Sequence, residues 1–246
     1  MKHLVLALLL LASASSAEGA IAYVQSATAT VTTATSITSG SINTTTGNGV
    51  IIFLPWSNFN YGFVSIVDNN SNSFTQAGSE VFSANFAAIR AYYNCNIAGR
   101  SGHTFTFTIG GADSLDIVIH EVSGQSTTSC LDQVTQAIDN TTSHSSGNIT
   151  TTQANEILLG AASTVDANAM TQTGTFTQVY NVTATGSVIG YLTGYRIVSA
   201  TGTYAYTHTT PGANRTAQSI VSIKEATAVT RRQKCIGCGA DKVLVE

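Results

Sequence analysis

The chain has few charged residues and almost no lysine. Only 9% of its 246 residues are Asp, Glu, Lys or Arg, and no lysine lies between Lys2 and Lys224. Four arginines stand against nine acidic residues from position 20 to 223, so the clustered cations that bind phosphate are missing. We therefore expect no nucleic-acid partner. The lack of lysine also excludes Schiff-base catalysis within this stretch.

No hydrophobic run is long enough to cross a membrane. Residues 4–11 form a compact apolar run, well short of the ~20 residues that a membrane-spanning helix needs. The run follows a short basic start and precedes small residues at 12–17, which is the plan of a secretory signal peptide. We therefore expect residues 1–17 to be a cleaved signal peptide, no transmembrane anchor, and a secreted, extracellular protein.

Helical spacing is also lacking, and a period of two dominates. Residues 103–109 alternate apolar side chains with three threonines, as in a strand with one buried face. Residues 49–56 and 115–122 are more continuously apolar, which predicts strands covered on both faces. Clusters of Gly, Asn, Asp and Ser separate such segments. The sequence predicts an all-β fold, a two-sheet jelly-roll-like β-sandwich, over residues 18–225.

Two segments of the chain echo each other weakly. Residues 102–108 read Gly-His-Thr-Phe-Thr-Phe-Thr and residues 202–208 read Gly-Thr-Tyr-Ala-Tyr-Thr-His, and a β-branched run follows each of them. Equivalent strand pairs in the two halves of one sandwich would produce this echo. The general likeness of threonine-rich strands would produce it as well, because alternation carries little information per residue.

Several turn and core motifs occur between residues 20 and 225. They are Val67-Asp68, residues 72–75, Tyr92-Tyr93, residues 96–99, residues 121–124, Leu131-Asp132 and residues 155–160. Together they resemble a threonine-rich β-sandwich module that recurs, largely uncharacterised, in exported proteins of environmental bacteria and in some phage proteins. The chain departs from that pattern where Val122 replaces the usual tyrosine and Asn70-Ser71 replaces a glycine-bearing turn. The resemblance implies fold and export, and it supplies no catalytic residues.

Most sequence motifs of catalysis are missing. The chain has no Gly-x-Ser-x-Gly elbow, no His-Glu-x-x-His pair and no Gly-x-x-x-x-Gly-Lys loop. Asp113, Asp116, Glu121 and Asp132 are close enough in sequence to place two carboxylates across a cleft, as in glycosidases. Acids at turns and strand ends are the commoner interpretation. By alternation, His103 shares a face with the neighbouring phenylalanines and reads as a packed histidine.

The strongest candidate for ligand recognition is an aromatic segment at residues 55–63. It contains Trp56, the only tryptophan, together with Phe59 and Tyr61 among amide side chains. Such a combination stacks on sugar rings or anchors a protein contact. In the alternative interpretation Trp56 caps the core at the end of its strand.

A calcium site is a weaker candidate. Asp68, Asn70 and Asn72 place oxygen-bearing side chains at alternate loop positions, which calcium accepts. The bidentate acid of a complete calcium loop is missing. The same residues are typical of a plain hairpin turn, which is the favoured interpretation.

Four cysteines in an exported protein predict oxidation. Cys95 and Cys130 can pair if their Cα atoms come within about 7 Å. Cys235 and Cys238 lie in a basic tail, residues 226–246, where the alternation stops. A single Cys-x-x-Cys supplies two of the four ligands of structural zinc, so a local disulfide, an intermolecular link and free thiols remain open. The tail offers a route to a homo-oligomer.

Three classes of function fit the sequence. The leading one is a non-enzymatic extracellular binding or adhesion module that contacts glycans or a cell or virion surface. The second is a structural or assembly protein of a surface layer or virion. The third is a polysaccharide-active hydrolase on the same scaffold, and we expect the protein not to be an enzyme. No cofactor other than calcium is indicated.

Overall fold

The computed structural model describes residues 19–57, 61–83, 87–164, 169–183 and 189–227, which form strands and loops without a helix. No helix among them could span a membrane. The expected signal peptide and nearly all of the tail, with Cys235 and Cys238, lie outside the described residues. The strands are β1 (Ala22–Thr38), β2 (Gly49–Trp56), β3 (Phe63–Asp68), β4 (Thr75–Ser83), β5 (Ala87–Asn94), β6 (Phe105–Ser123), β7 (Leu131–Ser145), β8 (Ile149–Thr150), β9 (Glu156–Thr164), β10 (Thr171–Thr173), β11 (Thr177–Val182), β12 (Gly190–Val198), β13 (Thr203–Tyr204) and β14 (Thr207–Lys224).

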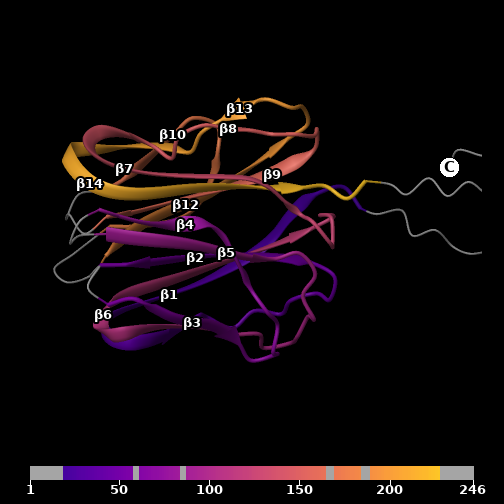
Figure 1. Ribbon diagram of the computed structural model, residues 1–246, viewed down its shortest axis with the longest axis horizontal. Helices are drawn as coiled ribbons and strands as arrows, with labels where there is room; N and C mark the ends of the chain where they lie inside the picture. The colour runs from indigo at the N-terminus through magenta and orange to yellow at the C-terminus, as the bar shows by residue number, and fades with distance from the viewer. Residues whose placement is uncertain (1–18, 58–60, 84–86, 165–168, 184–188, 228–246) are drawn as a thin grey trace, which may run out of the picture.

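Two six-stranded antiparallel sheets pack face to face, which confirms the predicted all-β sandwich (Figure 1). The first sheet has the order β1-β6-β2-β5-β4, with β3 also paired to β6. The second has the order β10-β14-β9-β12-β11, with β7 also paired to β14. Strands β8 and β13 form a separate two-stranded sheet.

The two halves of the chain repeat one sheet topology. Strands β1, β2, β3, β4, β5 and β6 have the same neighbours in the first sheet as β7, β9, β10, β11, β12 and β14 have in the second. The turn after the first strand is repeated as well, because Ser39 N donates to Phe105 O over 2.8 Å and Ser146 N donates to Tyr206 O over 3.0 Å. The segments of the sequence echo thus belong to equivalent regions, although Phe105 corresponds to Tyr206, one residue out of step with the alignment of residues 102–108 and 202–208. Each sheet is formed by one half of the chain. In a jelly roll, by contrast, consecutive strands are distributed over both sheets. The strand order is therefore that of two sheets formed one after the other along the chain.

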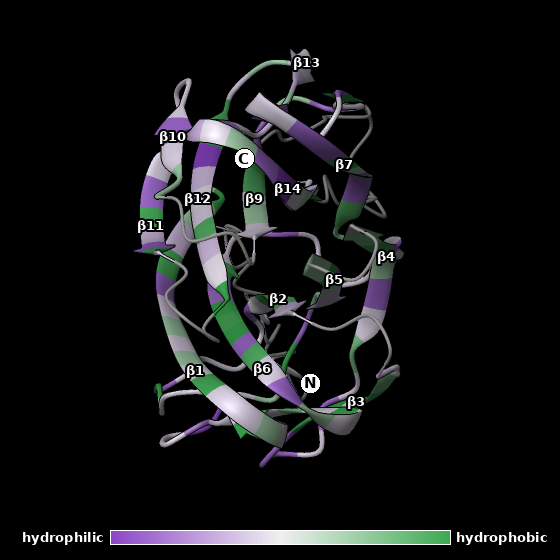
Figure 2. Ribbon diagram, turned by 90° about the vertical axis from the view of Figure 1, so that its left-hand side faces the viewer, coloured by the Kyte–Doolittle hydropathy of each residue, from purple (hydrophilic) through white to green (hydrophobic). Residues whose placement is uncertain are grey.

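Apolar side chains form three clusters, because each sheet is covered on both faces. The cluster between the sheets includes Phe53 and Val118 from the first sheet and Leu159 and Val221 from the second. A second cluster lies on the other face of the first sheet, and a third on the other face of the second sheet. Every residue of β2 is buried, which agrees with its continuous apolar run, and Figure 2 shows β2 and β9 as predominantly hydrophobic.

A disulfide joins the two halves. Cys95 follows β5 of the first sheet and Cys130 precedes β7 of the second, and their Cα atoms lie 5.6 Å apart. This is the pair that the sequence left as a candidate. The bond fastens the sheets to each other at one end of the interface between them.

Candidate functional site

The aromatic segment does not form the expected recognition surface. Trp56 is 0% exposed, and its ring packs against Phe107 in the cluster on the outer face of the first sheet. The expected ligand contact is therefore wrong for Trp56, because its strand is covered on both faces and the side chain points into the core. Phe59 lies outside the described residues. Tyr61 is 38% exposed, and its ring lies close over Gly111.

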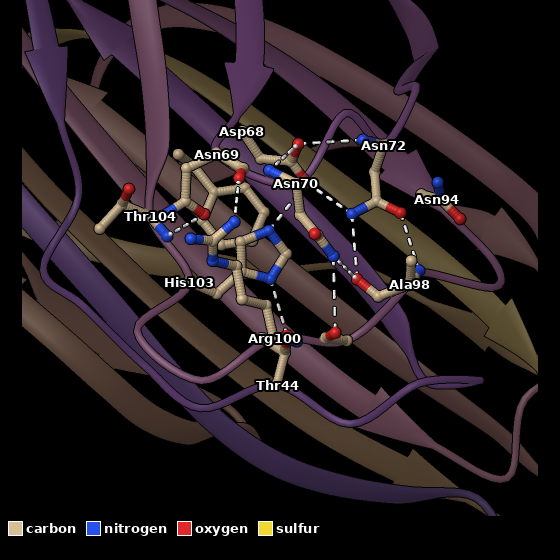
Figure 3. Close-up of polar contacts among 12 residues, drawn as sticks. Thr44, Asp68, Asn69, Asn70, Asn72, Asn94, Ala98, Arg100, His103 and Thr104 are labelled. Atoms are coloured by element: carbon tan, nitrogen blue, oxygen red, sulfur yellow. Dashed lines mark hydrogen bonds and ion pairs between the residues drawn. The ribbon is translucent and has the colours of Figure 1, made fainter.

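The richest polar arrangement lies instead where three loops of the first half meet. These are residues 39–48 between β1 and β2, residues 69–74 between β3 and β4, and residues 95–104 between β5 and β6, which we call the loop cluster. Figure 3 shows the hydrogen bonds that connect them. The register between β3 and β6 pairs Asp68, the last residue of β3, with Phe105, so Asp68 and His103, two residues before β6, lie at the same end of the sheet.

A buried chain of three side chains holds the loop cluster together. His103 Nε2 lies 2.8 Å from Asp68 Oδ2, and His103 Nδ1 lies 2.7 Å from Thr44 Oγ1. The backbone N–H of Arg100 also donates to Thr44 Oγ1, over 3.0 Å. The threonine proton is thus free to point at Nδ1, which leaves the Nε2 proton for Asp68. One side chain from each of two loops and one from a strand end are fixed by this relay.

The environment keeps Asp68 ionised. Its side chain and that of His103 are both 0% exposed. Burial by itself would raise the pKa of Asp68, but hydrogen bonds from Asn72, His103 and Asn70 lower that pKa below its ordinary value. A buried carboxylate is tolerated because each of its oxygens accepts hydrogen bonds.

The same contacts support the hairpin interpretation of residues 68–72. Asp68 Oδ1 accepts the backbone N–H groups of Asn70 and Asn72, and Asp68 Oδ2 accepts Asn72 Nδ2 over 2.6 Å. Asn72 Oδ1 accepts the N–H of Ala98, and Asn70 Nδ2 donates to Ala98 O. The carboxylate oxygens of Asp68 and the side-chain oxygen of Asn72 thus accept hydrogen bonds within the protein. Ser71, with a φ of 59°, completes a hydrogen-bonded turn.

Close approach of two loops depends on a glycine. A Cβ atom at Gly99 would overlap the backbone of Thr45 and Thr46. Gly99 N also donates to Thr46 Oγ1 over 2.9 Å. On the outside, Arg100 Nη1 donates to Asn69 O over 2.6 Å, and both residues are exposed. The result is a rigid rim of amide, hydroxyl and guanidinium groups.

The relay resembles the order of groups in a hydrolase triad, but its position favours a structural role. Thr44 is 9% exposed and His103 is 0% exposed, so the hydroxyl faces the interior. That hydroxyl also accepts a backbone hydrogen bond in place of approaching a substrate. The relay therefore acts by positioning loops.

The four carboxylates proposed for hydrolysis lie in different surroundings. Asp116 and Glu121 are buried; Thr30 donates to Asp116, and Glu121 accepts hydrogen bonds from Gln25, Thr45 N and Asn48. Burial raises the pKa of Asp116 to about 8, although the Thr30 hydrogen bond opposes this. Asp113 accepts hydrogen bonds from Ser57 and Ser114.

Asp132 has a carboxylate neighbour that sequence reasoning missed. Glu156 interacts with Asp132, and burial followed by this interaction raises the pKa of Glu156 to about 7. The pKa of Asp132 is lowered, since hydrogen bonds from Thr152 outweigh the effect of burial. Glu156 is 0% exposed, whereas Asp132 is partly exposed at the start of β7. The signal in the sequence was slight, because Glu156 opens an apolar strand.

The chain matches no known protein family, no curated protein and no solved structure. The resemblance to exported threonine-rich sandwich modules therefore stays a prediction.

Proposed function

We propose that this protein is a non-enzymatic extracellular binding or adhesion module, and that the loop cluster contacts its ligand. The observation that carries the proposal is the buried relay of Thr44, His103 and Asp68, which fixes three loops and their exposed polar groups. Preorganised loops lower the entropy cost of binding. Glycans are the ligand class that we propose, because the rim offers uncharged amides and hydroxyls beside one arginine.

Comparison of the two halves supports a special role for this end. In the first half Ile42 forms a β-bridge with His103, and in the second half Ile149 pairs in the same way with Tyr204. Tyr204 is therefore the equivalent of His103. The equivalent of Asp68 is Gly174, one residue beyond Thr173. A repeat that needed the relay for folding alone would be expected to keep it in both halves.

Export is part of the proposal. The N-terminal pattern at residues 1–17 predicts a signal peptide, and the Cys95–Cys130 disulfide fits an oxidising compartment. The resemblance to exported modules agrees with this location.

A glycan array on purified wild-type protein tests the proposal. The Arg100→Ala variant removes the guanidinium from the rim, and Arg196→Ala removes an arginine that packs on Tyr204 in the second half. We expect a specific signal that Arg100→Ala weakens and Arg196→Ala retains. Equal signals for both variants would place the ligand elsewhere, and a silent array for wild type would remove the glycan proposal.

An assembly function is the second candidate, because β3 is an edge strand with exposed apolar side chains. Val64 is 58% exposed and Val67 is 50% exposed. Unpaired strand edges with apolar residues favour pairing with another chain. Light scattering after size exclusion, with wild type and Val64→Lys compared, tests this function; an oligomer that the variant abolishes would favour assembly over glycan binding. No comparable observation among the described residues favours a hydrolase.

A further inference from the structure

Two patches of the surface carry hydroxyl groups in regular ranks. In the first half, β3, β6 and β1 lie in unbroken register over three residues each, and β10, β14 and β7 do so in the second half. We call their outward side chains the hydroxyl faces. The first face consists of five hydroxyl residues, Ser65, Thr106, Thr108, Ser36 and Thr38, and of the exposed Val67, which has no hydroxyl. The second face consists of Thr171, Thr173, Thr207, Thr209, Ser143 and Ser145. None of these side chains is buried.

The sheet geometry sets the spacing of the hydroxyl groups. Neighbouring strands are ~4.8 Å apart, and alternate residues along a strand repeat at ~6.7 Å. Hydrogen bonds across the strands restrict the side chains further: Thr38 and Thr106 hydroxyls lie 2.9 Å apart, and Thr173 and Thr207 hydroxyls lie 2.8 Å apart. Each face is therefore a two-dimensional array with fixed repeats.

The two halves agree more closely in these faces than in the residues beneath them. The inward-facing row of the first half is Ile66, Phe107 and Ile37, and the equivalent row of the second half is Gln172, His208 and His144. Further along β6 and β14, at Leu115 and Thr216, the change is similar, from Trp56, Leu115 and Val31 to Thr164, Thr216 and Asp139. Packing normally constrains interiors more than surfaces. The outward positions keep their hydroxyl groups in both halves, although the inward positions differ. This pattern points to a function of the surface.

The chemistry of the faces narrows the choice of partner. They carry no charge, so they offer nothing to nucleic acid or to anionic lipid. They carry no aromatic residue, methionine or arginine, which dominate protein contacts and stack on sugars. An ice surface is an uncharged lattice of water, and its oxygen atoms repeat at spacings close to the two repeats of a β-sheet. We propose that the two hydroxyl faces bind ice.

The arrangement of the faces gives the proposal a second consequence. Strands β3, β6 and β1 lie at one end of the molecule and β10, β14 and β7 at the other (Figure 1). Each face can therefore engage ice separately, and one molecule can hold ice at one end while the other end stays accessible. The loop cluster is not part of either face, so ice binding is independent of the proposed glycan site.

Ice-affinity partitioning tests the proposal directly. Wild-type protein is present while an ice hemisphere grows slowly, and the fraction incorporated into the ice is compared with that of a protein which ice excludes. The double variant Thr106→Lys/Thr207→Lys places a charged side chain in the middle of each face. The control variant Thr128→Lys/Thr177→Lys changes two exposed threonines outside the faces in the same way. Thermal melting verifies that both variants are folded.

We expect wild type and the control variant to enter the ice and the face variant to be excluded. Each single lysine variant should retain partial incorporation through the other face, and Val67→Thr, which completes the first face, should increase it. Exclusion of wild type from ice overturns the proposal, as does equal incorporation of the face and control variants. Binding to crystalline chitin or cellulose, or dimerisation through the faces, without incorporation into ice would also overturn it. Arg100→Ala should not affect incorporation, which separates this test from that of the glycan site.

Discussion

Removal of the Cys95–Cys130 disulfide should cost a large part of the protein's stability. The bond closes a chain segment with a sequence separation of 35 residues. In the chain-entropy treatment, cross-links of this span restrict the unfolded chain by about 13 cal/mol/K, which corresponds to about 4 kcal/mol at 25 °C. Domains are stable by about 5–15 kcal/mol, so the variant should stay folded with a much reduced margin.

The position of the bond makes the entropy argument applicable. Cys130 is 1% exposed and belongs to the cluster between the sheets, and its backbone N–H approaches Cys95 Sγ at 3.1 Å. The folded halves already meet through that cluster, so breaking the bond changes the unfolded chain more than the folded one. Alanine at both positions avoids leaving one buried thiol without a partner.

Urea denaturation of wild type and of Cys95→Ala/Cys130→Ala measures the loss. We expect a lower midpoint and a steeper dependence on urea, because the unfolded chain without the cross-link exposes more surface. Both proteins keep the cysteines of the tail, so their contribution cancels. A midpoint shift equivalent to less than about 1 kcal/mol would refute the reasoning, and so would detection of four free thiols in the unreduced, denatured wild type.

Four further predictions concern three substitutions and the addition of calcium. His208→Phe introduces the residue type found at the equivalent position of the first half and should stabilise the fold by about 1–2 kcal/mol, because it removes a buried imidazole with unpaired nitrogens. Burial lowers the pKa of His208 from 6.5 to about 3, so this residue destabilises the folded state as pH falls through that window. In urea titrations, the free energy of unfolding should therefore fall less steeply with decreasing pH in the variant than in wild type. Burial raises the pKa of Asp116 from 3.8 to about 8, so this residue destabilises the folded state increasingly as pH rises through that window, by up to ~1.4 kcal/mol per pH unit. The stability of Asp116→Asn relative to wild type should therefore increase with pH. A difference in melting temperature that does not depend on pH would contradict this. Gly99→Ala should cost about 1–3 kcal/mol through overlap with the neighbouring loop, whereas Gly62→Ala, with open space around it, should match wild type in a thermal melt. Added calcium should leave the melting temperature unchanged, since the oxygens of Asp68 already accept hydrogen bonds; a clear rise would revive the cation site.

The strands were predictable from the sequence because alternation reports directly on burial. Residues 103–109 behave as their pattern requires: Phe105 and Phe107 are 0% exposed, and the three threonines that alternate with the apolar residues are partly exposed. The continuous apolar run at 49–56 correctly predicted a strand covered on both faces. That prediction already implied a buried Trp56, but the polar residues after it suggested an exposed loop instead.

The site was harder to predict because its residues meet only through tertiary structure. Thr44, Asp68 and His103 come from three separate segments, and their contact depends on which loops share one end of the sheet. The hairpin interpretation of residues 68–72 described the local turn, and alternation indicated a packed His103. Neither reveals that the two join in one relay, since local patterns carry no information about register between distant strands.

The two halves share one topology but differ in the polarity of their interiors. The outer cluster of the first half is apolar and contains Trp56, Phe105 and Phe107. At the positions equivalent to Ile37 and Phe107, the second half buries His144, bonded to Asp139 and Thr210, and His208, whose ring stacks on that of His144 at 4.5 Å. Such a polar interior stabilises less than apolar packing. The second half therefore depends more on the shared cluster between the sheets and on the disulfide, while the outer apolar cluster of the first half provides the base from which the loop cluster projects.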